Sequence, residues 1–168
     1  MSYTPFVATS PRAIAGIGFQ DKILKQFKAL YSDIKFEMVW DLYKERDPTL
    51  TDRQLAIIEK EQGDITFMLG GERHYIECCF AMGPKISRLC EMKRTKFIGA
   101  NKYYCYGFAS REDIIFIASF TWNKYTSYIK QADPSCRIVP IKYILGLKNK
   151  YLGIENYMET IHNIKLNN

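Results

Sequence analysis

Residues 63–80 (GDITFMLGGERHYIECCF) restrict the fold more than any other stretch of this sequence. Two runs rich in β-branched and aromatic residues flank Gly70 and Gly71. A Gly-Gly pair suits a two-residue hairpin loop because glycine adopts positive φ without strain. With these glycines as the loop, residues whose numbers add to 141 lie opposite each other, so Leu69 faces Glu72. The pattern therefore predicts an antiparallel β-hairpin with a defined register.

This register places the hairpin side chains on two different faces, because successive side chains of a strand point to opposite sides of the sheet. The apolar face belongs to the core and carries Ile65, Phe67, Leu69, Ile76, Cys78 and Phe80. The other face carries Asp64, Thr66, Tyr75, Glu77 and Cys79. We also expect His74 to pack beside Phe67 and not to act as a ligand.

Asp64 and Glu77 stand directly opposite each other in this register. The Cβ atoms of such a pair lie about 4.5–5.5 Å apart, and two carboxylates at that distance repel each other. A divalent cation between them would remove the repulsion, and Mg²⁺ and Mn²⁺ prefer oxygen ligands of this kind. The alternative is a longer loop, which would shift the register and leave both acids on a solvated edge.

The sequence before the hairpin predicts two helices and a strand. Apolar residues spaced three or four apart predict an amphipathic helix over 19–34, with lysines on its outer face. Alternation of apolar and charged residues predicts a strand over 36–40. Thr51 and Gln54 are spaced as in a capping box, which would begin a short helix that ends near Glu61.

The sequence after the hairpin predicts a further mixture of helices and strands. We expect a helix over 84–97, strands over 103–109 and 114–120, a helix over 122–131, a strand over 136–139, and helices from Ile141. The resulting order indicates an α/β fold in which helices flank a mixed central β-sheet.

The length of 168 residues fits one compact domain, and no linker divides the chain. We divide this domain into an irregular arm over 1–17, a core over 18–120, and a helical extension with a short strand over 121–168.

Lys93 stands in the apolar stripe of the helix predicted over 84–97. This stripe is formed by Ile86, Leu89, Cys90 and Phe97. A buried lysine is costly unless a carboxylate or phosphate meets it. The Lys93 ammonium therefore either reaches water along a packed stem or points across the sheet to Asp64 and Glu77.

A helix, a strand, a hairpin with this Asp…Glu-x-x spacing, a helix and a strand together resemble the PD-(D/E)XK nuclease superfamily. The resemblance covers about residues 18–120 and implies the restriction-endonuclease-like αβββαβ core. It also implies a phosphodiesterase dependent on Mg²⁺ or Mn²⁺, with Asp64 and Glu77 at the two acidic positions and the backbone carbonyl of Cys78 as a further metal ligand. Gln20 matches the place where many members carry a glutamate on the first helix.

The sequence departs from the family motif at two positions. Gly63 replaces the proline, which we expect to matter little, and Cys79 replaces the lysine, which removes a fixed positive charge. Some branches, including cap-snatching viral nucleases, carry the lysine on the helix after the hairpin. Lys93 matches that position, with Lys96 and Lys102 as weaker substitutes, and the alternative is an inactive site.

A basic segment predicts the nucleic-acid interface. The net charge is +6, and the segment over 85–102 contributes Lys85, Arg88, Lys93, Arg94, Lys96 and Lys102. Tyr103 follows directly and can stack on a base or bind a phosphate. The alternative is an ordinary solvated helix face.

Several classes of protein are excluded or disfavoured by the same sequence. The longest apolar stretch, 114–120, is far shorter than the roughly 20 residues that span a bilayer. The N-terminus does not resemble a signal peptide, and five cysteines without a C-x-x-C pair favour a reducing cytoplasm over a zinc cluster. With only two histidines, hydrolytic chemistry would depend on carboxylates.

These features together predict an Mg²⁺- or Mn²⁺-dependent endonuclease, with DNA favoured over RNA as its substrate. Asp64 and Glu77 would hold the metal ion, and Lys93 would orient the attacking water. Specificity would come from the structure of the substrate or from a homodimer. The alternative is an inactive nuclease-like domain that binds nucleic acid or a protein. Frequent Lys, Asn and Ile suggest an AT-rich genome such as that of a phage or mobile element.

Overall fold

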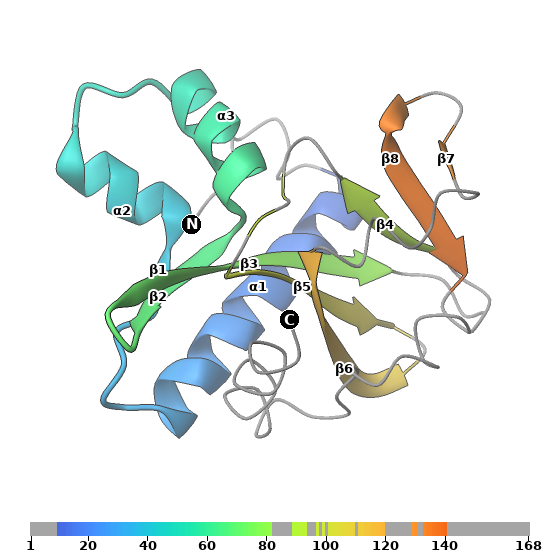
Figure 1. The fold of residues 1–168 in the computed structure, drawn as a ribbon, viewed down its shortest axis with the longest axis horizontal. Coiled ribbons are helices and arrows are strands. Elements are labelled where there is room, and N and C mark those ends of the chain that lie inside the picture. Colours follow the sequence, from blue (N-terminus) through green and yellow to red (C-terminus); the bar gives the residue numbers. More distant parts are fainter. Residues whose placement is uncertain are drawn as a thin grey trace.

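The computed structural model describes residues 10–81, 89–93, 97, 99, 101–109, 111–119, 129–130 and 133–140. Their elements are α1 (Pro11–Leu30), β1 (Glu37–Met38), α2 (Val39–Arg46), α3 (Asp52–Gln62), β2 (Ile65–Leu69), β3 (Glu72–Ala81), β4 (Leu89–Lys93), β5 (Lys102–Phe108), β6 (Arg111–Ala118), β7 (Ile129–Lys130) and β8 (Asp133–Pro140). Over these residues the fold is mixed α/β, as the sequence predicts (Figure 1).

The larger sheet is mixed and has the strand order β1-β2-β3-β5-β6. β2 runs antiparallel to β1 and to β3, β5 runs parallel to β3, and β6 returns antiparallel to β5. A smaller antiparallel sheet has the order β4-β8-β7. Figure 1 shows α1 lying across one face of the larger sheet, with α2 and α3 toward the β1 side.

The hairpin of β2 and β3 has the register that the sequence predicts. Its pairs run from Leu69 opposite Glu72 to Ile65 opposite Ile76. Gly70 and Gly71 have φ values of 58° and 78°, which the tight loop requires and which other residues rarely adopt. The longer loop that would shift the register is therefore excluded.

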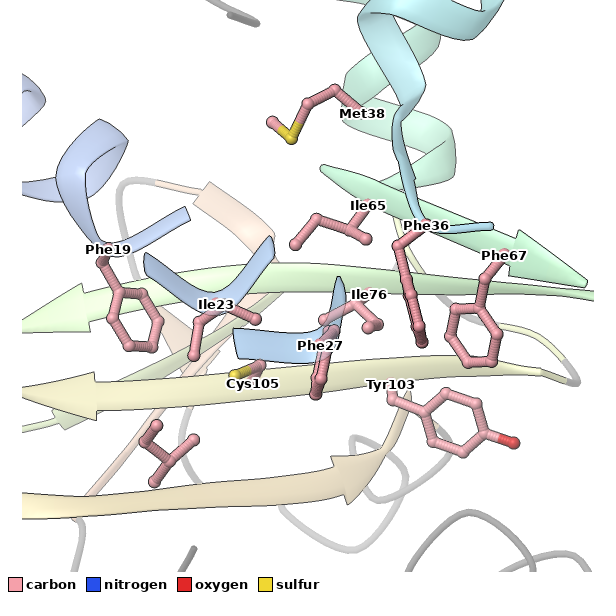
Figure 2. Close-up of a cluster of buried hydrophobic side chains, with 11 residues drawn as sticks. Phe19, Ile23, Phe27, Phe36, Met38, Ile65, Phe67, Ile76, Tyr103 and Cys105 are labelled. Carbon is pink, nitrogen blue, oxygen red and sulfur yellow. The ribbon is translucent and has the colours of Figure 1, made fainter. Parts of the chain in front are cut away.

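The core lies between α1 and the face of the sheet that carries Ile65, Phe67 and Ile76. Phe19, Ile23 and Phe27 of α1 are buried against that face. Figure 2 shows the Phe36 ring between the rings of Phe27 and Phe67, whose centroids lie 5.1 and 4.9 Å from it. His74 is buried and stacks on Phe67 at 5.1 Å, as predicted.

The first helix begins at Pro11, eight residues before the predicted start. Ser10 caps it by accepting a hydrogen bond from the Ala13 amide at 3.0 Å. Proline suits the first helical position because an N–H there would have no partner within the helix, so its absence costs nothing. The arm predicted over 1–17 is therefore wrong for residues 11–17. The apolar periodicity did not reveal these residues because they precede the stripe that packs on the sheet. Residues 1–9 lie outside the described part.

The strand predicted over 36–40 is limited to Glu37–Met38. The Val39 amide donates to the Asp64 carbonyl at 2.9 Å, and the chain turns into α2 at once. The helix after it, α3, begins at the predicted capping box: the Gln54 amide donates to the Thr51 hydroxyl, and the Thr51 amide donates to the Gln54 side chain.

The helix predicted over 84–97 is wrong for residues 89–93, which form β4 and pair with β8. Leu89, Cys90 and Phe97 fit a helical spacing, but Cys90 and Met92 also alternate with Glu91 and Lys93 as in a strand. Pairing with β8 decides between the two patterns, and so short a window does not.

The later predictions have mixed outcomes. The strands predicted over 103–109 and 114–120 correspond to β5 and β6, and that over 136–139 lies within β8. Residues 129–130 of the predicted helix over 122–131 form β7 instead. Residues 121–128 and those from 141 onward lie outside the described part. Among the described helices, none combines the length and apolar character that crossing a membrane requires.

Candidate functional site

The chain enters β2 through Gly63, the residue that ends α3. Gly63 has φ of 83°, and a Cβ atom there would lie 2.8 Å from the Ile76 carbonyl oxygen and 2.9 Å from the Phe97 ring. Proline cannot occupy this position because its ring fixes φ near −65°. This backbone therefore requires glycine at the entry into β2.

Asp64 is buried, with 4% of its surface exposed, and lies just before the first residue of β2. Its amide donates to the Ile76 carbonyl at 2.8 Å, and its Oδ2 accepts a hydrogen bond from the Cys78 amide at 2.8 Å. The ladder ends at the pair of Ile65 and Ile76, so Asp64 and Glu77 are not paired in the register. The predicted direct opposition of the two acids is wrong, because the backbone of Asp64 bonds to Ile76 and not at the position opposite Glu77.

The Cys78 carbonyl points to the same side of β3 as the Cys78 amide that Asp64 binds. The N–H and C=O of one residue in an extended strand point to the same side. The Ile76 carbonyl and the Cys78 amide both point toward the β2 side, and the Tyr75 amide points the other way, to the Asn101 carbonyl. The Cys78 carbonyl therefore faces the edge occupied by the Asp64 carboxylate.

Glu77 and Cys79 project from the face of β3 opposite to the core face. Both are half-buried, and their neighbours in β5 are Tyr104 and Tyr106, whose side chains are buried. The alternation of the two faces is as predicted. The peptide group that Asp64 binds joins Glu77 to Cys78, and the Glu77 side chain lies on the face that does not hold α1.

The Cys78 thiol faces Cys105 of β5, its partner in the register. The hydrogen bond with the Cys105 thiol raises the pKa of Cys78 well above its usual range, and burial and the charge of Asp64 act in the same direction. Cys78 therefore stays a neutral thiol, and it contributes only its backbone to this edge.

Lys102 is engaged by the end of α3. Its Nζ donates to the Glu61 carbonyl at 2.9 Å and lies 5.7 Å from the Phe97 ring centroid. Burial lowers the pKa of Lys102, and the Glu61 charge partly offsets this. A cation at the C-terminus of a helix is stabilised by the unpaired carbonyls there, so Lys102 supports the end of α3.

The described part of the structure places two of the remaining predicted site residues, Lys93 and Gln20. The backbone of Lys93 lies in β4 opposite Cys136, not on a helix. Gln20 is half-buried in α1, next to Phe19. Lys85, Arg88, Arg94 and Lys96 lie outside the described part.

Tyr103 must be withdrawn from the predicted nucleic-acid interface. Only 2% of its surface is exposed, and its ring stacks on His74 at 5.9 Å within the core. It occupies the core face because it is the β5 neighbour of Ile76, whereas Lys102 and Tyr104 alternate onto the other face.

The Asp64 and Glu77 carboxylates and the Cys78 carbonyl are all oxygen donors, the kind that a hard divalent cation prefers. Over the described residues, no group of three or more His, Cys, Asp or Glu side chains is arranged to hold a metal ion. A cation here would therefore need the backbone oxygen, and water or substrate oxygens, to complete its shell.

Sequence reasoning missed a group of aromatic and basic residues on the same face as Glu77. Arg73 and Tyr75 precede Glu77 on that face of β3, and Tyr43 and Arg46 of α2 lie near Tyr75. The alternation of Arg73, Tyr75 and Glu77 along β3 is the sequence feature that could have revealed this group.

A scan against protein-family models and a search of the curated proteins both found no match to this chain.

Proposed function

We propose that this chain is a divalent-metal-dependent nuclease with a PD-(D/E)XK-like site at the edge where β2 begins beside β3. The observation that carries the proposal is the buried Asp64 carboxylate, held by the Cys78 amide next to the Cys78 carbonyl. An antiparallel hairpin followed by β5, parallel to its second strand, also supports the restriction-endonuclease-like core.

Asp64, Glu77 and the Cys78 carbonyl would hold the cation. A bound Mg²⁺ or Mn²⁺ supplies an activated water and neutralises charge on the scissile phosphate. The Cys78 amide fixes the Asp64 carboxylate, so this ligand needs no reorganisation when the cation binds. For the lysine of the mechanism we retain Lys93 and Lys96, because the Lys102 ammonium is engaged by the Glu61 carbonyl.

Asp64→Asn separates the chemical role of this residue from its structural role. The amide oxygen of asparagine can still accept the Cys78 N–H, so the fold is retained while the charge is lost. Calorimetry with Mn²⁺ and cleavage of plasmid, branched DNA and single-stranded RNA should show the wild type active. We expect Asp64→Asn and Glu77→Gln to lose about 100-fold or more in cleavage, with exposed Asp33→Asn as the control.

Cleavage by Asp64→Asn at the wild-type rate would overturn the assignment of the site. If the wild type cuts, the loss of cleavage in either Lys93→Ala or Lys96→Ala identifies the lysine of the mechanism. Sedimentation velocity of the same samples tests the homodimer, which would dissociate into monomers on dilution.

A second candidate is a nuclease-like domain that binds nucleic acid or a protein without cutting. Cys79 in place of the motif lysine and the engagement of Lys102 favour it. Binding of an oligonucleotide with neither Mn²⁺ uptake nor cleavage would support this candidate over the enzyme.

A further inference from the structure

Three cations from three elements act electrostatically on the half-buried Tyr75 side chain. The Lys102 Nζ lies 5.9 Å from the ring centroid. Burial raises the pKa of Tyr75, Tyr43 acts in the same direction, and the charges of Arg73 and Arg46 lower it. Arg46 also places its guanidinium 5.7 Å from the centroid of the Tyr43 ring. We name these five residues, Tyr43, Arg46, Arg73, Tyr75 and Lys102, the Tyr75 surface.

The arginines of the Tyr75 surface are not neutralised by ion pairs within the described part of the chain. Glu37, which lies beside them, is paired with Lys35 at 3.1 Å. Glu45 is exposed on α2 and is the other acid that lines this region. The positive charge of the two arginines is therefore available to an anion, with Glu45 beside them and Glu61 beside Lys102 as the acids that partly offset the charge of the surface.

Arg73 is held in place by its neighbours. Its Nη1 donates to the Thr66 hydroxyl at 3.1 Å, and that hydroxyl donates to the His74 carbonyl at 2.9 Å. Thr66 is fully buried, so its position is fixed by the sheet. A guanidinium oriented in this way loses less entropy when it binds a phosphate.

A groove of about 490 Å³ lies beside Arg46 and Arg73 of this surface. It is lined by Lys35, Glu37, Leu42, Glu45, Arg46, Met68 and Arg73. Met68 is 45% exposed and adds apolar surface to the groove. The groove supplies cations and apolar atoms, and Tyr43 and Tyr75 of the Tyr75 surface supply flat rings outside its lining. Cations, rings and apolar atoms together are the combination that binds unpaired bases and their phosphates.

The surface also leads toward the proposed metal site. Arg73, Tyr75 and Glu77 lie on one face of β3 at intervals of two residues, or about 7 Å each. A chain bound along Arg73 and Tyr75 would therefore extend toward Glu77 and the Asp64 edge.

We propose that the Tyr75 surface binds single-stranded nucleic acid. Arg46 and Arg73 contact its phosphates, and Tyr75 and Tyr43 stack on its bases. A single strand fits because its bases expose their faces, which a duplex hides in its stack. For the substrate class this inference rests on the proposed nuclease function, but the binding itself does not require metal or cleavage.

Fluorescence anisotropy in EDTA tests the proposal without cleavage. The probes are labelled dT₁₂ and rU₁₂, with a 12-base-pair duplex and polyglutamate as competitors. We expect Tyr75→Ala to weaken single-strand binding about 5- to 150-fold, and Tyr75→Phe to bind like the wild type. Arg46→Glu should weaken binding about 10-fold and reduce its salt dependence. Lys22→Glu, which makes the same charge change on the exposed side of α1, should alter it less than about 2-fold.

Arg46 is exposed and makes no hydrogen bond to the sheet over the described residues, so Arg46→Glu should fold even if a Tyr75 variant does not. Equal losses in Arg46→Glu and Lys22→Glu would overturn the proposal, because net charge alone would then explain the binding. Tighter binding of the duplex, or displacement by polyglutamate with no effect of Tyr75→Ala, would also overturn it. Binding that follows the expected pattern with no Mn²⁺-dependent cutting would overturn only the nuclease. Cutting that is unaffected by every Tyr75-surface variant would overturn only this inference.

Discussion

The Cys78 amide in β3 has the Asp64 carboxylate as its acceptor because β2 begins at Ile65 and provides no backbone carbonyl there. A buried amide without an acceptor costs about 1–3 kcal/mol. The acid at this position is therefore explained in part by the fold, and a carboxylate alone would not establish catalysis. The nuclease proposal depends on the charge of Asp64, which asparagine removes while it keeps the hydrogen bond.

At the same scale, Gly63 and Gly16 give a matched pair of substitutions. Gly63→Ala must adopt φ near 83° with its methyl group 2.8 Å from the Ile76 carbonyl, so we expect a loss of about 2–4 kcal/mol in the free energy of unfolding. Gly16 lies within α1 with nothing within 4 Å of an added Cβ, so Gly16→Ala should gain about 0.5–1 kcal/mol. Urea denaturation measures both, and a neutral Gly63→Ala would contradict this account of the entry into β2.

At the scale of elements, the sequence predicted those features that are encoded locally. The hairpin register depends on Gly70 and Gly71, and the start of α3 depends on Thr51 and Gln54. Residues 89–93 became a strand because they pair with β8, more than 40 residues later in the sequence. No local pattern specifies such a partner, so the assignment of β4 could not be made from periodicity.

The candidate site also divides into features that are encoded locally and features that depend on tertiary structure. The two faces of β3 followed from alternation, which correctly placed Glu77 and Cys79 away from the core. The turn of the Asp64 side chain toward Cys78 depends on where the ladder ends, and the Tyr75 surface depends on how α2 folds beside the hairpin. Both are tertiary features that spacing in one chain does not reveal.

The contact of α1 with β5 gives a prediction about how two elements dock. A Cβ atom on Gly107 would overlap the Phe19 ring, which also packs on Phe80 with centroids 5.3 Å apart. We expect Gly107→Ala to lose about 1–3 kcal/mol of stability because the ring must move. In Phe19→Leu the added methyl group has more room, so the same substitution should cost less there.

A double-mutant cycle in urea measures this coupling. Gly107→Ala, Phe19→Leu and the double variant should give an interaction energy of about 1 kcal/mol or more in favour of the double variant. Additive losses would mean that α1 does not depend on the absence of a side chain at residue 107.

At the scale of the whole molecule, the packed interior should limit stability at alkaline pH. Burial raises the pKa of Tyr103 to about 12, and the pKa values of Cys78 and Tyr75 are also raised. Each of these groups loses its proton at lower pH in the unfolded chain than in the folded one. Between the two pKa values the folded state holds more protons, so the free energy of unfolding falls as pH rises.

The decline should begin near pH 9, where an unfolded cysteine titrates, and continue toward pH 12 as the tyrosines follow. Lys102 acts in the opposite direction, because its lowered pKa adds stability as pH rises through its range. Among the described residues, this gain is opposed by the losses from Cys78, Tyr75 and Tyr103. Urea midpoints measured under reducing conditions at pH 8, 9, 10 and 11 test the sign. Cys78→Ala should flatten the first part of the decline and Tyr103→Phe the last part, whatever their midpoints at pH 8. A wild-type midpoint that stays constant to pH 11 would mean that these groups titrate in the folded protein as they do in the unfolded chain.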